Sequence, residues 1–220
     1  MARPEKLQIN KVHFPVTTLG YGGRVGIWMQ GCSIRCPDCI SRDTWGYRPS
    51  FTISASDFIL SVAPWLRQAD GVTVSGGEPF DQPRGLRAFL SALRDKFAGD
   101  ILVYSGYPHE KLFSEHKMIL KFVDVLISEP FDLPAGQTLT LRGSDNQRIF
   151  LLTDLAKARY PADIDRQLWD KTRTMDVELD GNTLFMAGIP PPNAMQRLRA
   201  ELSRRGFHCK TSDQTPLIRA

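Results

Sequence analysis

Short apolar runs alternate with amphipathic segments along the first 130 residues of the chain. Four runs are short and largely apolar, as strands buried on both faces are: residues 25–30, 72–75, 101–104 and 124–127. Three segments space their apolar residues as helices do: residues 54–68, 83–99 and 109–122. This repeated strand, loop and helix order predicts parallel strands joined by right-handed crossovers, in an open doubly wound sheet or a barrel.

Two local signals refine this pattern. Residues 12–17 form a further strand candidate, which a glycine-rich turn at residues 20–23 joins to residues 25–30. This order predicts a hairpin before the first crossover. Pro64 falls inside the helix expected over residues 54–68, where it should kink or shorten the helix because it lacks a backbone N–H.

The pattern changes after residue 130. Two more strands are expected, at residues 138–141 and 148–152, on either side of a polar turn. The last section predicts a compact ββαβ appendage, with strands at 175–179 and 183–186, a helix at 192–205 and a short final strand. We therefore divide the chain into an α/β domain (residues 1–153), a connector (154–174) and a small α+β extension (175–220).

Composition and charge exclude several classes of protein. The chain has 220 residues, of which 42% are apolar and 24% charged, as in an ordinary globular protein. The net charge of +4 is spread out, without the concentrated basic stripe that nucleic-acid binding needs. The longest uncharged stretch, residues 181–196, contains three prolines and two glycines, so no membrane span is expected. No apolar segment follows the first basic residues, so we expect no signal peptide and a cytoplasmic protein.

Three of the four cysteines lie within eight residues of one another: Cys32, Cys36 and Cys39. They follow the apolar run at residues 25–30, on the loop that leaves its carboxyl end. A structural zinc site takes four ligands, usually from two Cys-x2-Cys pairs, and only one such spacing is present. Electron-transfer clusters use four cysteines. Three thiolates on one loop predict a [4Fe–4S] cluster with one iron open to a small-molecule ligand.

Other uses of these cysteines stay open. A zinc site would recruit Cys209 or a distant histidine as its fourth ligand. A dithiol redox site would use Cys36 and Cys39 and leave Cys32 without a role. We expect Cys209, far away near the C-terminus, to be an ordinary thiol.

Polar and glycine-rich loops follow the other apolar runs. Gly76 and Gly77 come directly after residues 72–75, and glycine lets backbone approach a ligand closely. Ser105 follows residues 101–104, and Ser128 follows residues 124–127. Because the carboxyl ends of parallel strands share one edge, where ligands gather in such folds, we expect these loops to converge on the cysteine loop.

These motifs resemble those of a known superfamily. The cysteine loop, with Thr44 and Trp45 after it, and the motif Ser75-Gly-Gly-Glu-Pro79 resemble the radical S-adenosylmethionine (SAM) superfamily. Residues 105–107, 124–127 and 141–148 resemble, more narrowly, the branch that activates anaerobic ribonucleotide reductase. The resemblance covers residues 10–152 and implies a partial (β/α)6 barrel. Asp38, where many superfamily members carry an aromatic residue, departs from the general pattern.

The resemblance also implies a chemistry. The three cysteines would hold the [4Fe–4S] cluster, and SAM would chelate its open iron and be cleaved reductively to a 5′-deoxyadenosyl radical. The implied SAM contacts are Gly76, Gly77, Glu78, Pro79, Ser105 and Ser128. The implied contacts to substrate, SAM or partner are Arg142, Asn146, Gln147 and Arg148. The implied partners are a glycyl-radical enzyme, whose backbone glycine would donate hydrogen, and an electron donor such as flavodoxin or ferredoxin.

Three functions remain open from the sequence. The first is a radical SAM activase of a glycyl-radical enzyme. The second keeps the same cofactors but acts alone on a peptide or small molecule. The third is a non-catalytic iron–sulfur or zinc protein, which would release no deoxyadenosine.

Overall fold

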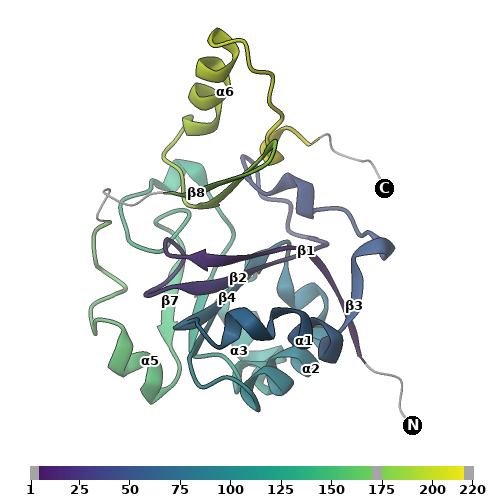
Figure 1. The fold of residues 1–220 in the computed structure, drawn as a ribbon. Coiled ribbons are helices and arrows are strands. Elements are labelled where there is room, and N and C mark those ends of the chain that lie inside the picture. Colours follow the sequence, from purple (N-terminus) through teal and green to yellow (C-terminus); the bar gives the residue numbers. More distant parts are fainter. Residues whose placement is uncertain (1–4, 170–174, 216–220) are drawn as a thin grey trace.

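A seven-stranded mixed sheet forms the centre of the protein (Figure 1). The computed structural model describes residues 5–169 and 175–215. The strands run in the order β3-β1-β2-β4-β5-β6-β7. Their bounds are β1 Lys6–Val16, β2 Arg24–Met29, β3 Thr52–Ser54, β4 Gly71–Gly76, β5 Asp100–Tyr104, β6 Val125–Ser128 and β7 Arg148–Leu151. The helices are α1 Ala55–Leu66, α2 Pro83–Arg94, α3 His109–Glu115, α4 Lys117–Leu120, α5 Asp154–Arg159 and α6 Ala194–Arg204.

The parallel part of the sheet is the one expected from the alternating pattern. Strands β2, β4, β5 and β6 are neighbours and parallel, and helices α1 to α4 lie in the crossovers between them. Strand β1 pairs antiparallel with β2, which confirms the predicted hairpin, and β7 pairs antiparallel with β6. The described part of the chain therefore contains four adjacent parallel strands. The barrel that the resemblance implies has six strand–helix units.

Two predicted elements before residue 154 differ in the structure. Residues 138–141 do not form a strand; only Leu139 makes a bridge, to Leu168, because the Asp145 carboxylate accepts the backbone N–H groups of Thr138 and Leu139. The helix expected at residues 109–122 breaks at His116, whose backbone leaves the helical region (φ −118°, ψ 23°).

The helix over residues 54–68 is close to its prediction. Ser54 caps it, its side chain accepting the N–H of Asp57, and α1 continues past Pro64 to Leu66. In the expected connector, α5 occupies the first six residues, and residues 170–174 lie outside the described part. In the extension, β8 (Met175–Asp180), β9 (Thr183–Gly188) and α6 are present. The described residues that follow α6 form a 3-10 turn at Ser212–Gln214 in place of the expected final strand.

The two faces of the sheet pack differently. On one face, the apolar sides of α1 and α2 cover alternate residues of the parallel strands and form the main core, with Phe58, Phe89 and Leu90 fully or nearly buried. The other face packs on the segment after β6 and on the extension. No helix in the described part of the chain combines the length and hydrophobicity needed to cross a membrane.

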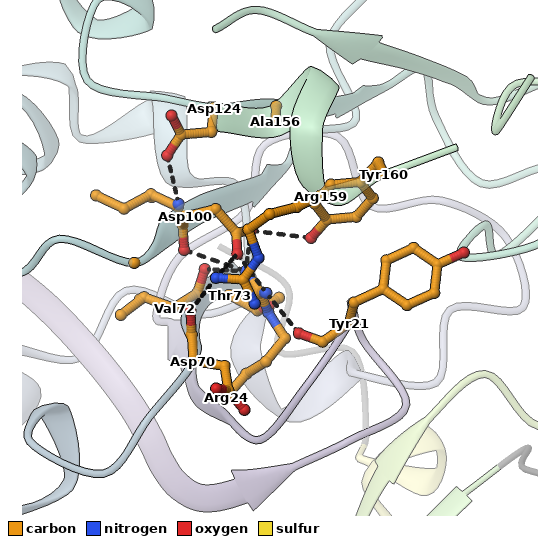
Figure 2. Close-up of polar contacts among 12 residues, drawn as sticks. Tyr21, Arg24, Asp70, Val72, Thr73, Asp100, Asp124, Ala156, Arg159 and Tyr160 are labelled. Atoms are coloured by element: carbon orange, nitrogen blue, oxygen red, sulfur yellow. Dashed lines mark hydrogen bonds and ion pairs between the residues drawn. The ribbon is translucent and has the colours of Figure 1, made fainter. Parts of the chain in front are cut away.

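A buried polar cluster fills the amino ends of the parallel strands (Figure 2). Arg24 opens β2 and Asp100 opens β5; both side chains are fully buried and lie 2.8 Å apart (Nη2 to Oδ2). Arg24 also donates to the Thr73 hydroxyl and the Val72 carbonyl. Gly71 makes room for it, because a Cβ there would come 2.2 Å from the guanidinium. Since this cluster closes the amino ends of the strands, the carboxyl ends are left for a ligand.

Candidate functional site

The cysteine loop is folded tightly onto the end of β2. The N–H of Gly31 donates to the carbonyl of Thr44 (2.7 Å), and the N–H of Cys32 donates to the carbonyl of Trp45 (3.1 Å). Arg35 and Asp38, which directly precede the next two cysteines, adopt left-handed conformations (φ 52° and 60°). Such conformations are uncommon for non-glycine residues. The loop therefore turns sharply before each cysteine.

The three sulfurs lie in an apolar setting with backbone donors around them. Burial raises the pKa of the Cys32 thiol to about 12, although the N–H groups of Ile34 and Arg35 favour its thiolate. Burial also raises the pKa of Cys36 and of Cys39, and the N–H of Ser41 lies 3.4 Å from the Cys39 sulfur. Three thiolates at such sites need a cation to compensate them, and a metal centre supplies one.

The spacing of the sulfurs favours a cluster over a single ion. Zn–S bonds of about 2.3 Å hold the sulfurs of a tetrahedral site about 3.8 Å apart. In the described part of the chain, the sulfurs of Cys32, Cys36 and Cys39 do not all lie within 4.8 Å of one another. The donors are all thiolate sulfurs, the ligands that iron–sulfur clusters take. The loop thus fits a cluster of several irons.

The glycine turn after β4 lies directly against the cysteine loop. The N–H groups of Gly77 and Glu78 donate to the carbonyls of Met29 (2.9 Å) and Gly31 (2.8 Å). A Cβ on Gly77 would come 2.1 Å from the Gly31 oxygen, so only glycine fits there. The carboxyl ends of β2 and β4 are therefore joined by backbone contacts.

Glu78 extends this junction to the end of β5. Its side chain is 1% exposed. The carboxylate accepts the hydroxyl of Ser105 (2.8 Å), the N–H of Gly106 (2.7 Å) and the N–H of Phe80 (3.0 Å). No Lys or Arg in the described residues pairs with it. Glu78 thus connects the loops that follow β4 and β5.

Glu78 should give the metal-free protein a distinct pH dependence. Burial raises the pKa of Glu78 from 4.5 to about 7. Between these values the folded protein keeps a proton that the unfolded chain has lost, so the free energy of unfolding falls as pH rises, by at most about 3 kcal/mol. Urea unfolding of the reduced, metal-free protein at about pH 5 and about pH 7.5 measures this. The variant Glu78→Gln should lose this pH dependence, whereas Glu110→Gln, at an exposed position, should keep it. If the free energy of unfolding changes equally with pH in all three proteins, Glu78 is not the group responsible.

A second carboxylate, which the sequence did not single out, fixes the start of the cysteine loop. Asp81 accepts the N–H and the hydroxyl of Ser33 (2.7 and 2.9 Å) and the hydroxyls of Tyr107 (2.7 Å) and Tyr47 (3.2 Å). Asp81 lies three residues after Glu78. The one feature of the sequence that could have indicated its role is this position of an acidic residue close behind the glycine motif. Its partners come from separate loops, which no local pattern reveals.

A cavity of about 1030 Å³ opens at the carboxyl ends of the strands. The predicted residues that line it are Cys32, Cys36, Cys39, Gly76, Gly77, Glu78 and Ser105. Pro79 and Ser128 are not in its wall: both are buried, and Ser128 donates to the Glu129 carboxylate (3.3 Å). The structure therefore brings the three cysteines together with most of the implied SAM contacts.

The polar turn before β7 contributes one of its four predicted contacts. Gln147 lines the cavity, and its amide donates to the carbonyl of Glu129 (3.0 Å). Arg142 is buried and turned toward Asp165 (2.8 Å). The remaining two residues are outside the cavity wall: Asn146 donates to the Pro130 carbonyl, and Arg148 lies 2.9 Å from the His109 ring.

Glu129 also lines the cavity, in a left-handed conformation (φ 82°). It lies 2.8 Å from His109, and with Glu110 these residues place three possible metal ligands close together. The Arg148 guanidinium lies 2.9 Å from Nε2 of His109, the nitrogen that also faces Glu110 (3.1 Å), and its positive charge disfavours a metal cation there. His109 and Glu129 therefore form a hydrogen-bonded pair that fixes the chain directly after the carboxyl end of β6.

Comparisons with known proteins agree with this geometry. The family model of the 4Fe-4S single cluster domain matches residues 18–150. The anaerobic ribonucleoside-triphosphate reductase-activating protein of Enterobacteria phage T4 is 32% identical over 142 residues, which cover 61% of this chain and 88% of that protein. Its namesake from Escherichia coli is 30% identical, with coverages of 61% and 93%. The pyruvate formate-lyase-activating enzyme of Staphylococcus aureus is 29% identical, with coverages of 70% and 62%.

A solved structure of QueE from Escherichia coli also aligns, over 46% of this chain and 53% of that chain, at 20% identity. Its TM-score of 0.40 is too low to carry any weight here.

The matched region contains the cysteine loop, the glycine turn and the parallel strands that hold them. The chain therefore belongs to the 4Fe-4S single cluster domain family. Within it, the three-cysteine motif and the named relatives make it a radical SAM oxidoreductase of the glycyl-radical-activating type.

Proposed function

We propose that this enzyme cleaves SAM reductively at a [4Fe–4S] cluster held by Cys32, Cys36 and Cys39, in order to activate a glycyl-radical enzyme. One observation carries the proposal: the three cysteines line the same cavity as the glycine turn and Ser105. When bound, the cluster would supply the electron that converts SAM to methionine and a 5′-deoxyadenosyl radical. The radical would then take a hydrogen atom from a backbone glycine of the partner.

The side chains and backbone of the site would bind and orient SAM. The glycine turn exposes backbone beside the cysteine loop, where its carbonyl oxygens suit an ammonium group. Glu78 would assist by its negative charge and by holding Ser105 and Gly106 in place, the contacts described above. Pro79 and Ser128, being outside the cavity wall, would act through the shape of their loops.

The framework proposed for this chemistry is the partial (β/α)6 barrel; the four neighbouring parallel strands β2, β4, β5 and β6 and the helices between them support it. The domain division at residues 153 and 174 belongs to the same proposal. It agrees with the end of the family match at residue 150. A flavodoxin or ferredoxin is the proposed electron donor, because the reaction consumes one low-potential electron and the chain offers ligands for a single cluster.

The test is anaerobic reconstitution with iron and sulfide, followed by reduction in the presence of SAM. We expect a brown protein that releases 5′-deoxyadenosine and methionine. With a candidate glycyl-radical enzyme added, we expect a glycine-centred doublet in electron paramagnetic resonance. A protein that takes up zinc in place of iron and releases no deoxyadenosine under any reducing condition would contradict the proposal.

A second function, a radical SAM enzyme that acts alone on a peptide or small molecule, has one observation in its favour. Residues after the family match line much of the cavity, so the substrate of this chain need not be that of its relatives. Deoxyadenosine release that depends on an added peptide or metabolite, with no radical on a reductase, would favour this alternative.

A further inference from the structure

The C-terminal extension supplies about half of the residues that line the cavity. These residues lie between Met175 and Gln214, beyond the family match at residues 18–150. In Figure 1 β8 lies beside β1, and α6 projects beyond it, away from the central sheet. The outer part of the cavity is therefore a feature of this chain beyond its family domain.

The hairpin of β8 and β9 is firmly attached to the sheet. The Asp176 carboxylate accepts the N–H and hydroxyl of Thr17 (both 2.7 Å) and those of Thr18 (3.1 and 2.8 Å). Phe185 of β9 stacks on His13 of β1, with ring centroids 3.9 Å apart, and packs edge-on to Trp28. Four hydrogen bonds to one carboxylate and an aromatic stack make the hairpin a fixed wall rather than a movable lid.

The far end of the extension reaches the cysteine loop. The Ser212 hydroxyl donates to the carbonyl of Ile40 (2.7 Å), the residue after Cys39. Arg199 of α6 pairs with Asp213 (2.8 Å) and donates to the Thr211 hydroxyl (2.6 Å). The extension thus spans the cavity from the β1 side to the cysteine side, and its inner surface is continuous with the cluster site.

The inner surface of the extension is apolar, with amide groups at its edge. Half-buried apolar side chains face the cavity from β9 and α6: Met186, Met195, Leu198 and Leu202. Asn182 and Asn193 also line it, and side-chain amides can bond both the N–H and the C=O of a peptide. Of the cationic side chains on this surface, Arg199 is paired with Asp213, and Lys210 is exposed at the rim. Flexible methionine side chains adapt to varied apolar partners.

We propose that the extension is the substrate-selecting wall of this enzyme, and that the outer cavity binds an extended, uncharged polypeptide segment with apolar side chains. This inference rests on the proposed function, because radical transfer at the cysteine end requires the segment to reach it. The cavity volume of about 1030 Å³ is at the upper end of the roughly 300–1,000 Å³ of small-molecule pockets, and its outer part extends away from the cysteine loop along the extension. A fixed wall admits a chain segment but excludes a folded domain.

Peptide binding to the full-length protein, with and without reconstituted cluster, tests this. The probe is an end-blocked, fluorescein-labelled peptide of about ten residues, roughly 33 Å when extended, in which leucines alternate with glycines. Its counterpart carries serine in place of each leucine. By fluorescence polarisation we expect the leucine peptide to bind at least about tenfold more tightly than the serine peptide. Full burial of a single leucine, which contributes about 1.5–3 kcal/mol, is enough for this difference.

Two matched variants of α6 locate the binding. Leu198→Asp places a carboxylate on the lining face and should weaken binding of the leucine peptide at least about tenfold, because the charge lies unpaired against apolar groups. Ala200→Asp adds the same charge at an exposed position of the same helix and should change affinity less than about twofold. Met195→Asp, a second lining variant, should repeat the first result. Circular dichroism checks that each variant is folded.

The outcomes separate this inference from the proposed function. Equal affinity for the two peptides, or equal effects of Leu198→Asp and Ala200→Asp, would overturn the substrate-selecting wall even if SAM cleavage is intact. Peptide discrimination in a protein that never cleaves SAM would leave the wall standing and remove the proposed function. In Ala200→Asp, which lies outside the cavity wall, SAM cleavage without peptide should equal that of the unmodified enzyme.

Discussion

Replacing Cys36 with alanine is expected to abolish both iron uptake and SAM cleavage. Cys36 lies in the middle of the loop and lines the cavity with Cys32 and Cys39. With two thiolates left, the cluster loses a third of its protein ligands. Loss of one outer-shell contact to a metal ligand already costs 10–100-fold in affinity or activity, so loss of the ligand itself should exceed about 100-fold. Iron and sulfide analysis after anaerobic reconstitution, with deoxyadenosine quantified by chromatography, measures both effects.

The matched control is Cys209→Ala. Cys209 is exposed and lines the outer cavity from the extension. If three cysteines hold the cluster and leave one iron open, this variant should bind four irons and cleave SAM as the unmodified protein does. Loss of the cluster in Cys209→Ala would make it a fourth ligand and would refute the open iron. An unchanged iron content in Cys36→Ala would refute the three-cysteine site altogether.

The parts of the site that follow local patterns could be predicted from the sequence. Residues 25–29 are apolar without interruption because β2 is buried on both faces, and the cysteine loop must leave its end. Gly76 and Gly77 identified the turn at the end of β4, because the backbone of Met29 beside Gly76 and that of Gly31 beside Gly77 leave no space for a side chain. In parallel sheets these loop positions share one edge, so the convergence followed from topology.

The outer half of the cavity could not be predicted, because long-range contacts create it. Asp176 and Thr17 are 159 residues apart, and each is an ordinary polar residue in its local sequence. Ser212 reaches Ile40 across 172 residues. A periodic pattern locates the hairpin and the helix of the extension, but it contains no information about the surface on which they pack.

Arg24 shows the same limit at the other end of the sheet. The apolar pattern begins the strand at Val25 and leaves Arg24 outside, as a charged residue near a turn normally is. In the structure it is the first residue of β2 and is fully buried, because Asp100, 76 residues away, lies beside it. Burial of a charge is favourable only when a partner is present, and the sequence does not reveal the partner.

Breaking this pair from the acidic side is expected to destabilise the protein strongly. Asp100→Leu would leave the Arg24 guanidinium buried, with the Thr73 hydroxyl and backbone carbonyls as its remaining acceptors (Figure 2). Removing one partner of a buried ion pair typically costs about 3–5 kcal/mol, because the other charge stays uncompensated. Urea unfolding should therefore show a lower midpoint at an unchanged slope.

The double variant Arg24→Met/Asp100→Leu decides the cause of that loss. Replacing both charges with apolar side chains removes the uncompensated cation, and such replacements are often neutral or stabilising. We expect the double variant to be more stable than Asp100→Leu alone by at least about 2 kcal/mol. Arg159→Ala is the control: Arg159 also contacts Asp100 (3.1 Å) but is 28% exposed, so its loss should cost less than about 1 kcal/mol. If the double variant is no more stable than Asp100→Leu, the buried charge is not the cause, and the loss comes from packing of the side chains.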